Sequence, residues 1–139
     1  MKEVPFPEIP FDEFDFRKKK AMKCMEEDGL DALLLFNNQN LAYFLGFRKT
    51  WLFQWLHAGV LTKKGQAGIV IPQIMHEVAR QATWLEDENI KPWGGASHWG
   101  LPQDPAEAVV KLIKKLGLED KTIGVEIGGP AYTYMNVGL

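Results

Sequence analysis

The chain has 139 residues, of which 46% are hydrophobic and 24% are charged, and its formal net charge is −2. This composition predicts one globular domain over residues 1–139 and gives no bulk attraction for nucleic acid or anionic membranes. The sequence has no apolar stretch near the ~18 residues that span a bilayer, no signal-peptide pattern, and a single cysteine, Cys24. These features exclude an intramolecular disulfide and favour a cytoplasmic protein.

The first elements expected along the chain are a surface arm and a helix. Residues 1–13 interleave prolines with Phe and Ile, a pattern that forbids a regular helix and indicates an arm lying on a surface. A helix is expected over residues 14–27, and Gly29 provides its end. The residues at helical spacing that this helix should bury are Phe14, Ala21, Met22 and Met25.

A short strand and an aromatic turn follow this helix. Residues 31–36 contain the run Ala-Leu-Leu-Leu-Phe, which is too short for a helix and typical of a strand covered on both faces. Asn37, Asn38 and Asn40 are turn and cap residues. Gly46 can end one or two helical turns by adopting a positive φ.

The middle of the chain predicts a hairpin and a second helix. One strand within residues 55–62 and another over 67–71 are joined by residues 63–66, Lys-Lys-Gly-Gln, which have the chemistry of a hairpin turn. A helix is expected over residues 73–86. Residues 90–93 form an edge strand at best, because Pro92 cannot donate to a ladder. The apolar face expected of the helix comprises Ile74, Val78, Ala82 and Leu85.

The last elements are a strongly patterned helix and a final strand. Asp104 should cap the helix, Pro105 suits its first turn, and Glu107 would complete a capping box. Gly117 ends the helix, and a strand follows at residues 122–127. Helices that alternate with short apolar strands, together with the hairpin, predict a layered α/β domain with a mixed sheet. The expected buried stripe of the helix is Val109, Val110, Leu112, Ile113 and Leu116.

The sequence offers no set of residues that predicts catalysis or metal binding. Its histidines, His57, His76 and His98, stand far apart in different settings. Residues 76–80 read HEVAR, in which Arg80 stands where the second histidine of an HExxH zinc motif must be. We therefore expect no catalytic and no metal-binding residues in this chain. His57 is expected to be a hydrogen-bonded core or sheet histidine, and Cys24 a buried thiol and not a nucleophile.

Two glycine pairs, Gly94-Gly95 and Gly128-Gly129, follow expected strands. Backbone N–H groups at such a pair could bind an anion. Plain turns explain both pairs more simply, and the sequence has neither a GxGxxG nor a GxxxxGK[ST] phosphate-binding loop. An independent module that binds a nucleotide or an anion there is the weakest hypothesis for this chain.

Large aromatic residues and cations cluster between residues 48 and 55, at the expected junction of a loop and a strand. A patch of this kind either buries against another subunit or forms one wall of a ligand pocket. A buried core position is the alternative, because most large aromatics in a domain of this size are core residues. The candidate substrate-facing or interface residues are Arg48, Trp51, Phe53 and Trp55.

Several short features occur in an order that resembles a known family. They are Arg17 in the first helix, the run GLDALLL at residues 29–35, Asn40, the pairs Tyr43-Phe44 and Gly46-Phe47, a hairpin with a Lys-Gly turn, and Gly124-Val125-Glu126. From about residue 17 to residue 126, this order is similar to the N-terminal domain of the creatinase/prolidase family, which includes the Xaa-Pro aminopeptidases. Two departures blur the subfamily: Leu45 where Thr or Ser is common, and Asn37-Asn38 in place of small residues or Pro.

The resemblance implies a three-layer α/β/α domain with a mixed sheet and ribonuclease-H-like topology. It also implies a parent protein whose chemistry resides in a C-terminal pita-bread domain, absent from this chain, with two divalent metal ions (Mn, Co or Zn) held by carboxylates and a histidine. In such proteins the N-terminal domain builds the oligomer. A loop after the Tyr-Phe-x-Gly-Phe segment, here residues 48–55, can reach a neighbouring subunit's active site and restrict it to small substrates.

The leading hypothesis is therefore a non-catalytic N-terminal domain of a metal-dependent Xaa-Pro peptidase-like hydrolase, of dipeptidase or aminopeptidase type. It would contact its own C-terminal catalytic domain, form a homodimer and line a pocket for a small peptide substrate. The alternative keeps the fold but places it in a creatinase-like enzyme that acts on a non-peptide small molecule, or in a metal-free binding relative. Metal carboxylates downstream of residue 139 would decide between them.

Overall fold

A computed structural model describes residues 9–48 and 55–127 of the chain. The strands of that part are β1 (Ala32–Leu35), β2 (Ala58–Thr62), β3 (Ala67–Pro72), β4 (Ile90–Trp93) and β5 (Ile123–Val125). The α-helices are α1 (Phe11–Glu27), α2 (Asn38–Leu45), α3 (His76–Ala82) and α4 (Pro105–Lys115). Short 3-10 helices, η1 (Gln73–Met75), η2 (Asp87–Asn89) and η3 (Ser97–Trp99), lie within the connections. Within these ranges, no helix is long and apolar enough to cross a membrane.

The strands form one mixed sheet in the order β4-β3-β2-β1-β5. β2 is antiparallel to both of its neighbours, whereas β1 pairs in parallel with β5, and β3 in parallel with β4. The predicted hairpin is confirmed: residues 63–66 join β2 to β3, and Gly65 takes a φ of +80° in the turn. The predicted edge position of residues 90–93 is also confirmed, because β4 lies at one side of the sheet.

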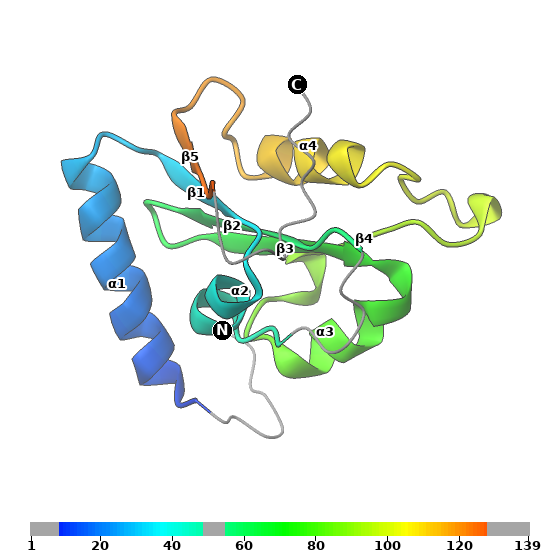
Figure 1. Cartoon of the computed structure of the whole chain (residues 1–139), viewed down its shortest axis with the longest axis horizontal. Coiled ribbons are helices and arrows are strands. Elements are labelled where there is room, and N and C mark those ends of the chain that lie inside the picture. Colours follow the sequence, from blue (N-terminus) through cyan, green and yellow to red (C-terminus); the bar gives the residue numbers. More distant parts are fainter. Residues whose placement is uncertain (1–8, 49–54, 128–139) are drawn as a thin grey trace.

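Helices cover both faces of this sheet (Figure 1). α4 lies on one face, and α1, α2 and α3 lie on the other. Successive residues of a strand point to opposite faces, so Leu35 of β1 packs with α1 and α2, whereas its neighbour Leu34 packs with α4. A strand covered in this way has apolar residues at every position. The expected three-layer α/β/α fold with a mixed sheet is thereby confirmed.

Glycines in β2 and β3 let the helices approach the sheet closely. A Cβ atom at Gly68 of β3 would lie 2.6 Å from Leu112 Cδ1 of α4. On the other face, a Cβ atom at Gly59 of β2 would lie 2.6 Å from Leu45 Cδ1 of α2. Because neither separation fits a side chain without movement, these glycines set how closely the two helical layers pack on the sheet.

α1 begins at Phe11, three residues before the expected start at residue 14, because Pro10 serves as its N-cap residue. Proline is tolerated at the start of a helix, where its missing N–H group has no partner to lose. The helix buries the predicted face, although Met22 is only partly buried against the core. The buried residues of α1 are Phe14, Ala21 and Met25.

Arg17 joins α1 to α2. Its Nη1 donates to the carbonyl oxygen of Tyr43 at 3.1 Å, and its guanidinium carbon lies 4.2 Å from the centre of the Tyr43 ring. Its Nε donates to Glu13 Oε1 at 2.8 Å. A cation that stacks on an aromatic face and donates to the same residue restricts the angle between the two helices.

The second predicted helix is shorter than expected and buries a different face. Residues 73–75 form η1, and α3 ends at Ala82, where Thr83 adopts an extended backbone with φ −96° and ψ 155°. The prediction that Ile74 and Val78 are core residues is wrong, because they are 66% and 45% exposed. The stripe that faces the sheet is Met75 and Ala79, one residue later and thus rotated by about 100°.

α4 has the predicted cap. Asp104 Oδ1 accepts a hydrogen bond from the N–H group of Ala106 at 2.8 Å. The Glu107 carboxylate pairs with Lys111 Nζ at 2.7 Å, one turn further along the helix. Val110, predicted in the buried stripe, is 48% exposed and that prediction is wrong. Val109 and Leu112, which were predicted in the same stripe, are confirmed as buried and face the sheet together with Ala108.

Candidate functional site at the carboxyl edge of the sheet

One edge of the sheet gathers the strand ends and the segment that carries Trp55, one of the candidate residues. β1, β3, β4 and β5 all end at this edge, and the antiparallel β2 begins there. We call it the carboxyl edge. In open α/β sheets, ligands commonly bind outside the carboxyl ends of the strands. The segments that meet at this edge are residues 36–37, 55–57, 72–73, 93–95 and 126.

Glu126 is the polar centre of the carboxyl edge. Its Oε2 accepts hydrogen bonds from the N–H groups of Phe36 at 2.7 Å and Asn37 at 2.8 Å, and its Oε1 accepts from Asn40 Nδ2 at 2.6 Å. Its own N–H group donates to the carbonyl oxygen of Leu34 at 3.0 Å. One carboxylate therefore holds the end of β5, the turn after β1 and the first turn of α2. Sequence analysis assigned Glu126 no role beyond the family motif. The Asn-rich turn, whose N–H donors need an acceptor, is the sequence signal that points to such a carboxylate.

α2 leads the chain from this carboxylate to Arg48. Asn37 Oδ1 accepts from the N–H group of Gln39 at 2.9 Å and so caps the helix. Gly46 ends it with a φ of +75°, as predicted, and its N–H group donates to the carbonyl oxygen of Ala42 at 3.1 Å. The backbone then passes through buried Phe47 to the surface.

Phe47 and His57 fix the two ends of the candidate segment. The Phe47 ring is fully buried and stacks on the His57 ring, with ring centres 5.6 Å apart. His57 is itself buried, and its Nδ1 lies 2.8 Å from the carbonyl oxygen of Trp55. Because a carbonyl can only accept, Nδ1 carries the proton in this hydrogen bond. The prediction of a hydrogen-bonded core histidine is confirmed.

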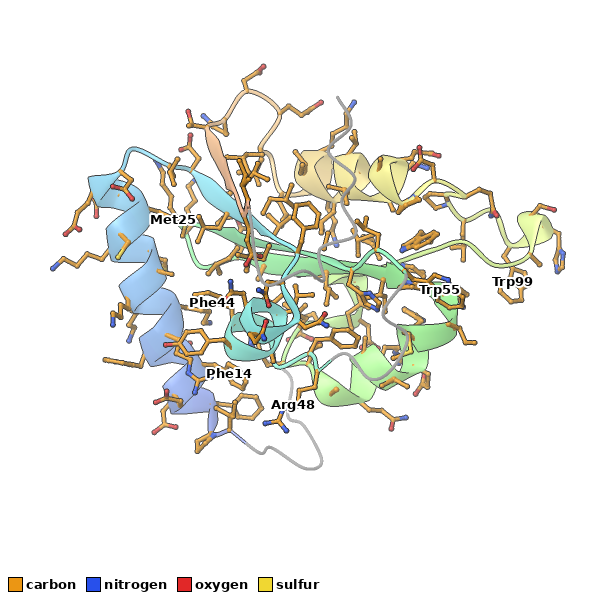
Figure 2. All side chains as sticks on the ribbon, in the orientation of Figure 1. Phe14, Met25, Phe44, Arg48, Trp55 and Trp99 are labelled. Atoms are coloured by element: carbon orange, nitrogen blue, oxygen red, sulfur yellow. The ribbon has the colours of Figure 1, made fainter. Side chains whose placement is uncertain are left out.

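Two of the four candidate residues, Arg48 and Trp55, lie in the described part of the chain. Arg48 is exposed, and Trp55 is 41% exposed. Figure 2 shows them apart, with Arg48 below α2 and Trp55 near the ends of β3 and β4. Trp51 and Phe53 lie outside the described residues. That these four residues face a partner or a substrate stays a prediction.

Two other tryptophans tie β4 to its neighbours at the carboxyl edge. Trp93 Nε1 donates to the carbonyl oxygen of Leu56 at 3.0 Å, which joins the end of β4 to the residues just before β2. The ring of Trp99, which is 53% exposed, lies over Gly95, where a Cβ atom would be 2.6 Å from the ring. Figure 2 shows Trp99 and Trp55 on the same side of the molecule, where β4 ends.

The pair Gly94-Gly95 forms a turn. Both residues take a positive φ, +75° and +88°. The N–H group of Gly94 donates to the carbonyl oxygen of Pro102 at 2.7 Å, so it is committed within the chain and not offered to an anion. The pair Gly128-Gly129 lies outside the described residues.

Residues 76–80 belong to an ion-pair cluster. Arg80, which stands in place of a second zinc histidine, pairs with Glu77 at 3.0 Å and also with Asp87. Partial burial, and then the nearby Arg80, lower the pKa of His76. In the part of the chain that the structure describes, no three His, Cys, Asp or Glu residues gather in a way that could hold a metal ion.

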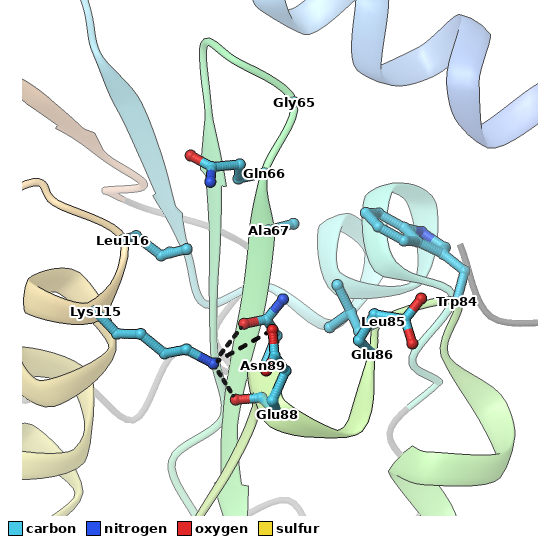
Figure 3. Close-up of a pocket in the computed structure, with 10 residues that line it drawn as sticks. All are labelled: Gly65, Gln66, Ala67, Trp84, Leu85, Glu86, Glu88, Asn89, Lys115 and Leu116. Carbon is cyan, nitrogen blue, oxygen red and sulfur yellow. Dashed lines mark hydrogen bonds and ion pairs between the residues drawn. The ribbon is translucent and has the colours of Figure 1, made fainter.

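A polar cavity of about 230 Å³ lies at the opposite end of the sheet, beside the β2–β3 turn (Figure 3). Lys115 Nζ donates across its wall to the carbonyl oxygen of Glu88 at 2.5 Å and to Asn89 Oδ1 at 2.9 Å. The cation of this cavity is thus engaged in joining α4 to η2. We therefore interpret the polar residues of this cavity as a structural link between α4 and η2, and not as a ligand site.

An apolar groove of about 340 Å³ lies between α1 and α2, with Cys24 on its wall. Cys24 is exposed, so the prediction of a buried thiol is wrong. The helix turns by about 100° per residue, and because Met25 faces the core, its neighbour Cys24 faces away from it.

The profile of the creatinase/prolidase N-terminal domain matches residues 17–137. No curated protein sequence matches the chain. A dipeptidase from Pyrococcus horikoshii OT3 superposes with a TM-score of 0.62 and 19% identity, over 83% of this chain and 29% of that chain. An Xaa-Pro dipeptidase from Bacillus anthracis superposes with a TM-score of 0.56 and 21% identity, over 80% of this chain and 26% of that chain.

A solved N-terminal domain of an Xaa-Pro dipeptidase from Lactobacillus brevis has a TM-score of 0.60 and 15% identity, over 79% of this chain and 75% of that chain. At such identities the structural likeness establishes the fold alone. The chain spans only 29% of the length of the Pyrococcus horikoshii protein. The profile match, in contrast, extends over most of the sequence and includes Arg17, Tyr43 and Glu126. On that match, this chain belongs to the creatinase/prolidase N-terminal domain family.

Proposed function

We propose that this chain is the non-catalytic N-terminal domain of a metal-dependent Xaa-Pro peptidase-like hydrolase. It contributes to oligomerisation and supplies part of the wall of a substrate pocket in its parent protein. Family membership and the likeness to Xaa-Pro dipeptidases from Bacillus anthracis and Lactobacillus brevis support this assignment. A C-terminal catalytic domain would hold two divalent metal ions, Mn, Co or Zn, which supply Lewis-acid chemistry when bound.

The exposed indole of Trp55 is the observation that carries the contact role. Trp55 is 41% exposed, although the residues that follow it enter the buried strand β2. Hydrogen bonds from His57 to the Trp55 carbonyl oxygen and from Trp93 to the Leu56 carbonyl oxygen fix the backbone beneath it. A large aromatic held on a fixed backbone is well suited to contact another surface at low entropic cost.

The proposed contact segment runs from residue 48 to residue 55, with Arg48, Trp51, Phe53 and Trp55 as its contact residues. In the parent protein it would reach a neighbouring subunit, a small peptide substrate, or both. Arg48 would supply a cation for a carboxylate, and the aromatics would supply apolar contact area.

Replacement of Trp55 tests this role. Trp55→Ala should cost much less unfolding free energy than the loss of a fully buried aromatic, because Trp55 is 41% exposed. In the parent protein, the same change should weaken self-association or raise KM for an Xaa-Pro dipeptide. Phe47→Ala is the matched control, since loss of a fully buried aromatic should cost roughly 3–5 kcal/mol. If urea denaturation shows equal losses for both variants, Trp55 is a core residue and the contact role is wrong.

Peptide hydrolysis tests the non-catalytic assignment. We expect the purified chain, with added Mn²⁺ or Co²⁺, to hydrolyse an Xaa-Pro dipeptide no faster than a mock preparation. Hydrolysis by the chain alone would contradict the assignment. We expect metal-dependent hydrolysis by the parent protein. Activity of that protein on a non-peptide small molecule only, or on neither substrate, would favour the creatinase-like or the metal-free alternative.

A further inference from the structure

β4 and the end of α4 bring two lysines together on one face of the sheet. Lys91 of β4 lies opposite Val70 of β3, and Val70 packs in the core on the α4 side. Residues opposite each other in neighbouring strands point to the same face of the sheet, so Lys91 points toward α4. Lys115 is the last residue of α4, which packs against β4. The two side chains therefore approach each other from an edge strand and from the helix that covers it.

Lys115 is held in place beside Lys91. Its Nζ donates to the carbonyl oxygen of Glu88 at 2.5 Å and to Asn89 Oδ1 at 2.9 Å (Figure 3). Ile90 is extended, with φ −100° and ψ 109°, so the side chains of Asn89 and Lys91 lie on the same side of the chain. An ammonium group has three N–H donors, and the third donor of Lys115 is directed to Lys91 Nζ. Such a bond requires a neutral amine as its acceptor.

The surroundings of Lys91 favour this neutral amine. Partial burial of the side chain, and then the charge of Lys115, lower the pKa of Lys91 from the ordinary value of a lysine, whereas Glu88 acts in the opposite direction. Among the described residues, no carboxylate forms an ion pair with Lys91, because Glu88 Oε1 lies 4.0 Å from Lys115 Nζ instead. A lysine that is partly desolvated and lies next to another cation is an activated nucleophile.

We propose that Lys91 is a modification site at which CO₂ forms a carbamate that Lys115 binds. The lone pair of the neutral Nζ attacks the carbon of CO₂, and a C–N bond forms. One C–O π-electron pair moves to oxygen, and one Nζ proton passes to solvent, so the product is an N-carboxylate and no group is oxidised or reduced. The third donor of Lys115 then makes a charge-assisted hydrogen bond to this carboxylate.

The charge of the product distinguishes CO₂ from other electrophiles. An acyl donor would convert Lys91 to a neutral amide, which offers Lys115 no charged acceptor. An aldehyde would form an imine, and its protonated form would keep the repulsion between the two side chains. CO₂ is small and uncharged, so it reaches a partly buried amine without a dedicated pocket. The carbamate would also join β4 to α4 through one more ionic contact.

Chemical trapping tests the inference. The purified chain is equilibrated with ¹³C-labelled bicarbonate, which supplies labelled CO₂, and its carbamates are ethylated with triethyloxonium ion before peptide mass spectrometry. We expect trapped label on Lys91, with an occupancy that rises with pH as the amine loses its proton. Lys111 provides the matched control, because it pairs with Glu107 at 2.7 Å and so stays an ammonium. Lys111→Arg should leave the occupancy of Lys91 unchanged.

Variants of the pair separate the roles of the two lysines. Lys91→Arg should abolish the signal, because a guanidinium stays protonated and is not a nucleophile. Lys115→Met removes the cation that binds the carbamate and should lower its occupancy roughly two- to fivefold. Lys115→Arg retains a cation and should restore most of the occupancy. Circular dichroism should show that these variants fold.

A wild-type chain with no trapped label on Lys91 would overturn the inference, and this result does not require any variant to fold. Equal label on Lys111 would overturn it as well, because the reaction would then be unselective. An occupancy that Lys115→Met leaves unchanged would contradict the binding of the carbamate by Lys115. Label that persists at full level in Lys91→Arg would place the carbamate on another residue. The proposed function is unaffected by any of these results, because it concerns residues 48–55.

Discussion

Asp31 joins three strands at the end of the sheet opposite the carboxyl edge. Its Oδ1 pairs with Lys63 Nζ at 2.8 Å, and its Oδ2 accepts from the N–H group of Thr122 at 3.0 Å. Its backbone N–H group donates to the carbonyl oxygen of Thr122 at 2.8 Å. The hydrogen bond from Lys63, and then that from Thr122, hold the pKa of the Asp31 carboxyl below its usual range.

This lowered pKa predicts a pH-dependent stability. An aspartate whose folded pKa is depressed stabilises the fold at pH values above its unfolded pKa of about 3.9. That contribution is lost as the pH falls through the lower folded pKa. Asp31→Asn should therefore reduce the urea midpoint at neutral pH, and the difference from wild type should shrink in acid. Asp120→Asn, in the neighbouring turn, is the control. A difference that stays constant from neutral to acidic pH would refute the assigned cause.

Local signals at single residues were the most informative part of the sequence. The positive φ of Gly46 and the side-chain cap at Asp104 were both predictable, because each depends on residues fewer than five positions away. The three hydrogen bonds of Glu126 were not predictable in this way. Its partner Phe36 is 90 residues distant in the chain, and no local pattern marks which carboxylate will reach a given turn.

At the scale of elements, the sequence predicted where helices occur better than which faces they bury. The pattern at Ile74 and Val78 has helical spacing, yet the buried stripe lies one residue later. Residues 73–75 form a 3-10 helix, and the extended backbone of Thr83 ends α3 earlier than expected. The buried face of α3 therefore depends on the direction in which the chain leaves β3 and enters η1. The predictions that Val110 and Cys24 are buried were wrong for the same reason, because burial depends on which side of each helix faces the core.

The cap of α4 gives a prediction at this scale. Asp104→Ala removes the acceptor for the N–H group of Ala106 and should cost about 0.5–2 kcal/mol of unfolding free energy. Asp104→Asn retains a capping oxygen, so its loss of unfolding free energy should be only a small part of the loss in Asp104→Ala. Urea denaturation of both variants measures the effect. Equal and large losses for both would show that the negative charge, and not the cap, supports the helix.

At the scale of the whole molecule, the close fit of the layers depends on glycine. Gly68→Ala would place its methyl group 2.6 Å from Leu112 Cδ1 and 3.0 Å from the carbonyl oxygen of Asn89. We expect a loss of about 1–3 kcal/mol, because α4 and the turn before β4 must move. In the double variant with Leu112→Ala, part of the strain is relieved, so the combined loss should be smaller than the sum. Strict additivity in urea denaturation would indicate that Gly68 does not limit the packing of α4.

The position of β1 has a consequence for the newly made chain. β1 lies between β2 and β5, and the N–H groups of Phe36 and Asn37 are satisfied by Glu126. During translation, the 90 residues that separate Phe36 from Glu126 take roughly 5–20 s to emerge from the ribosome. Throughout that interval, one side of β1 is an open apolar edge, which is the kind of surface that recruits other strands. The nascent polypeptide therefore carries this open edge until β5 has been made and pairs with β1.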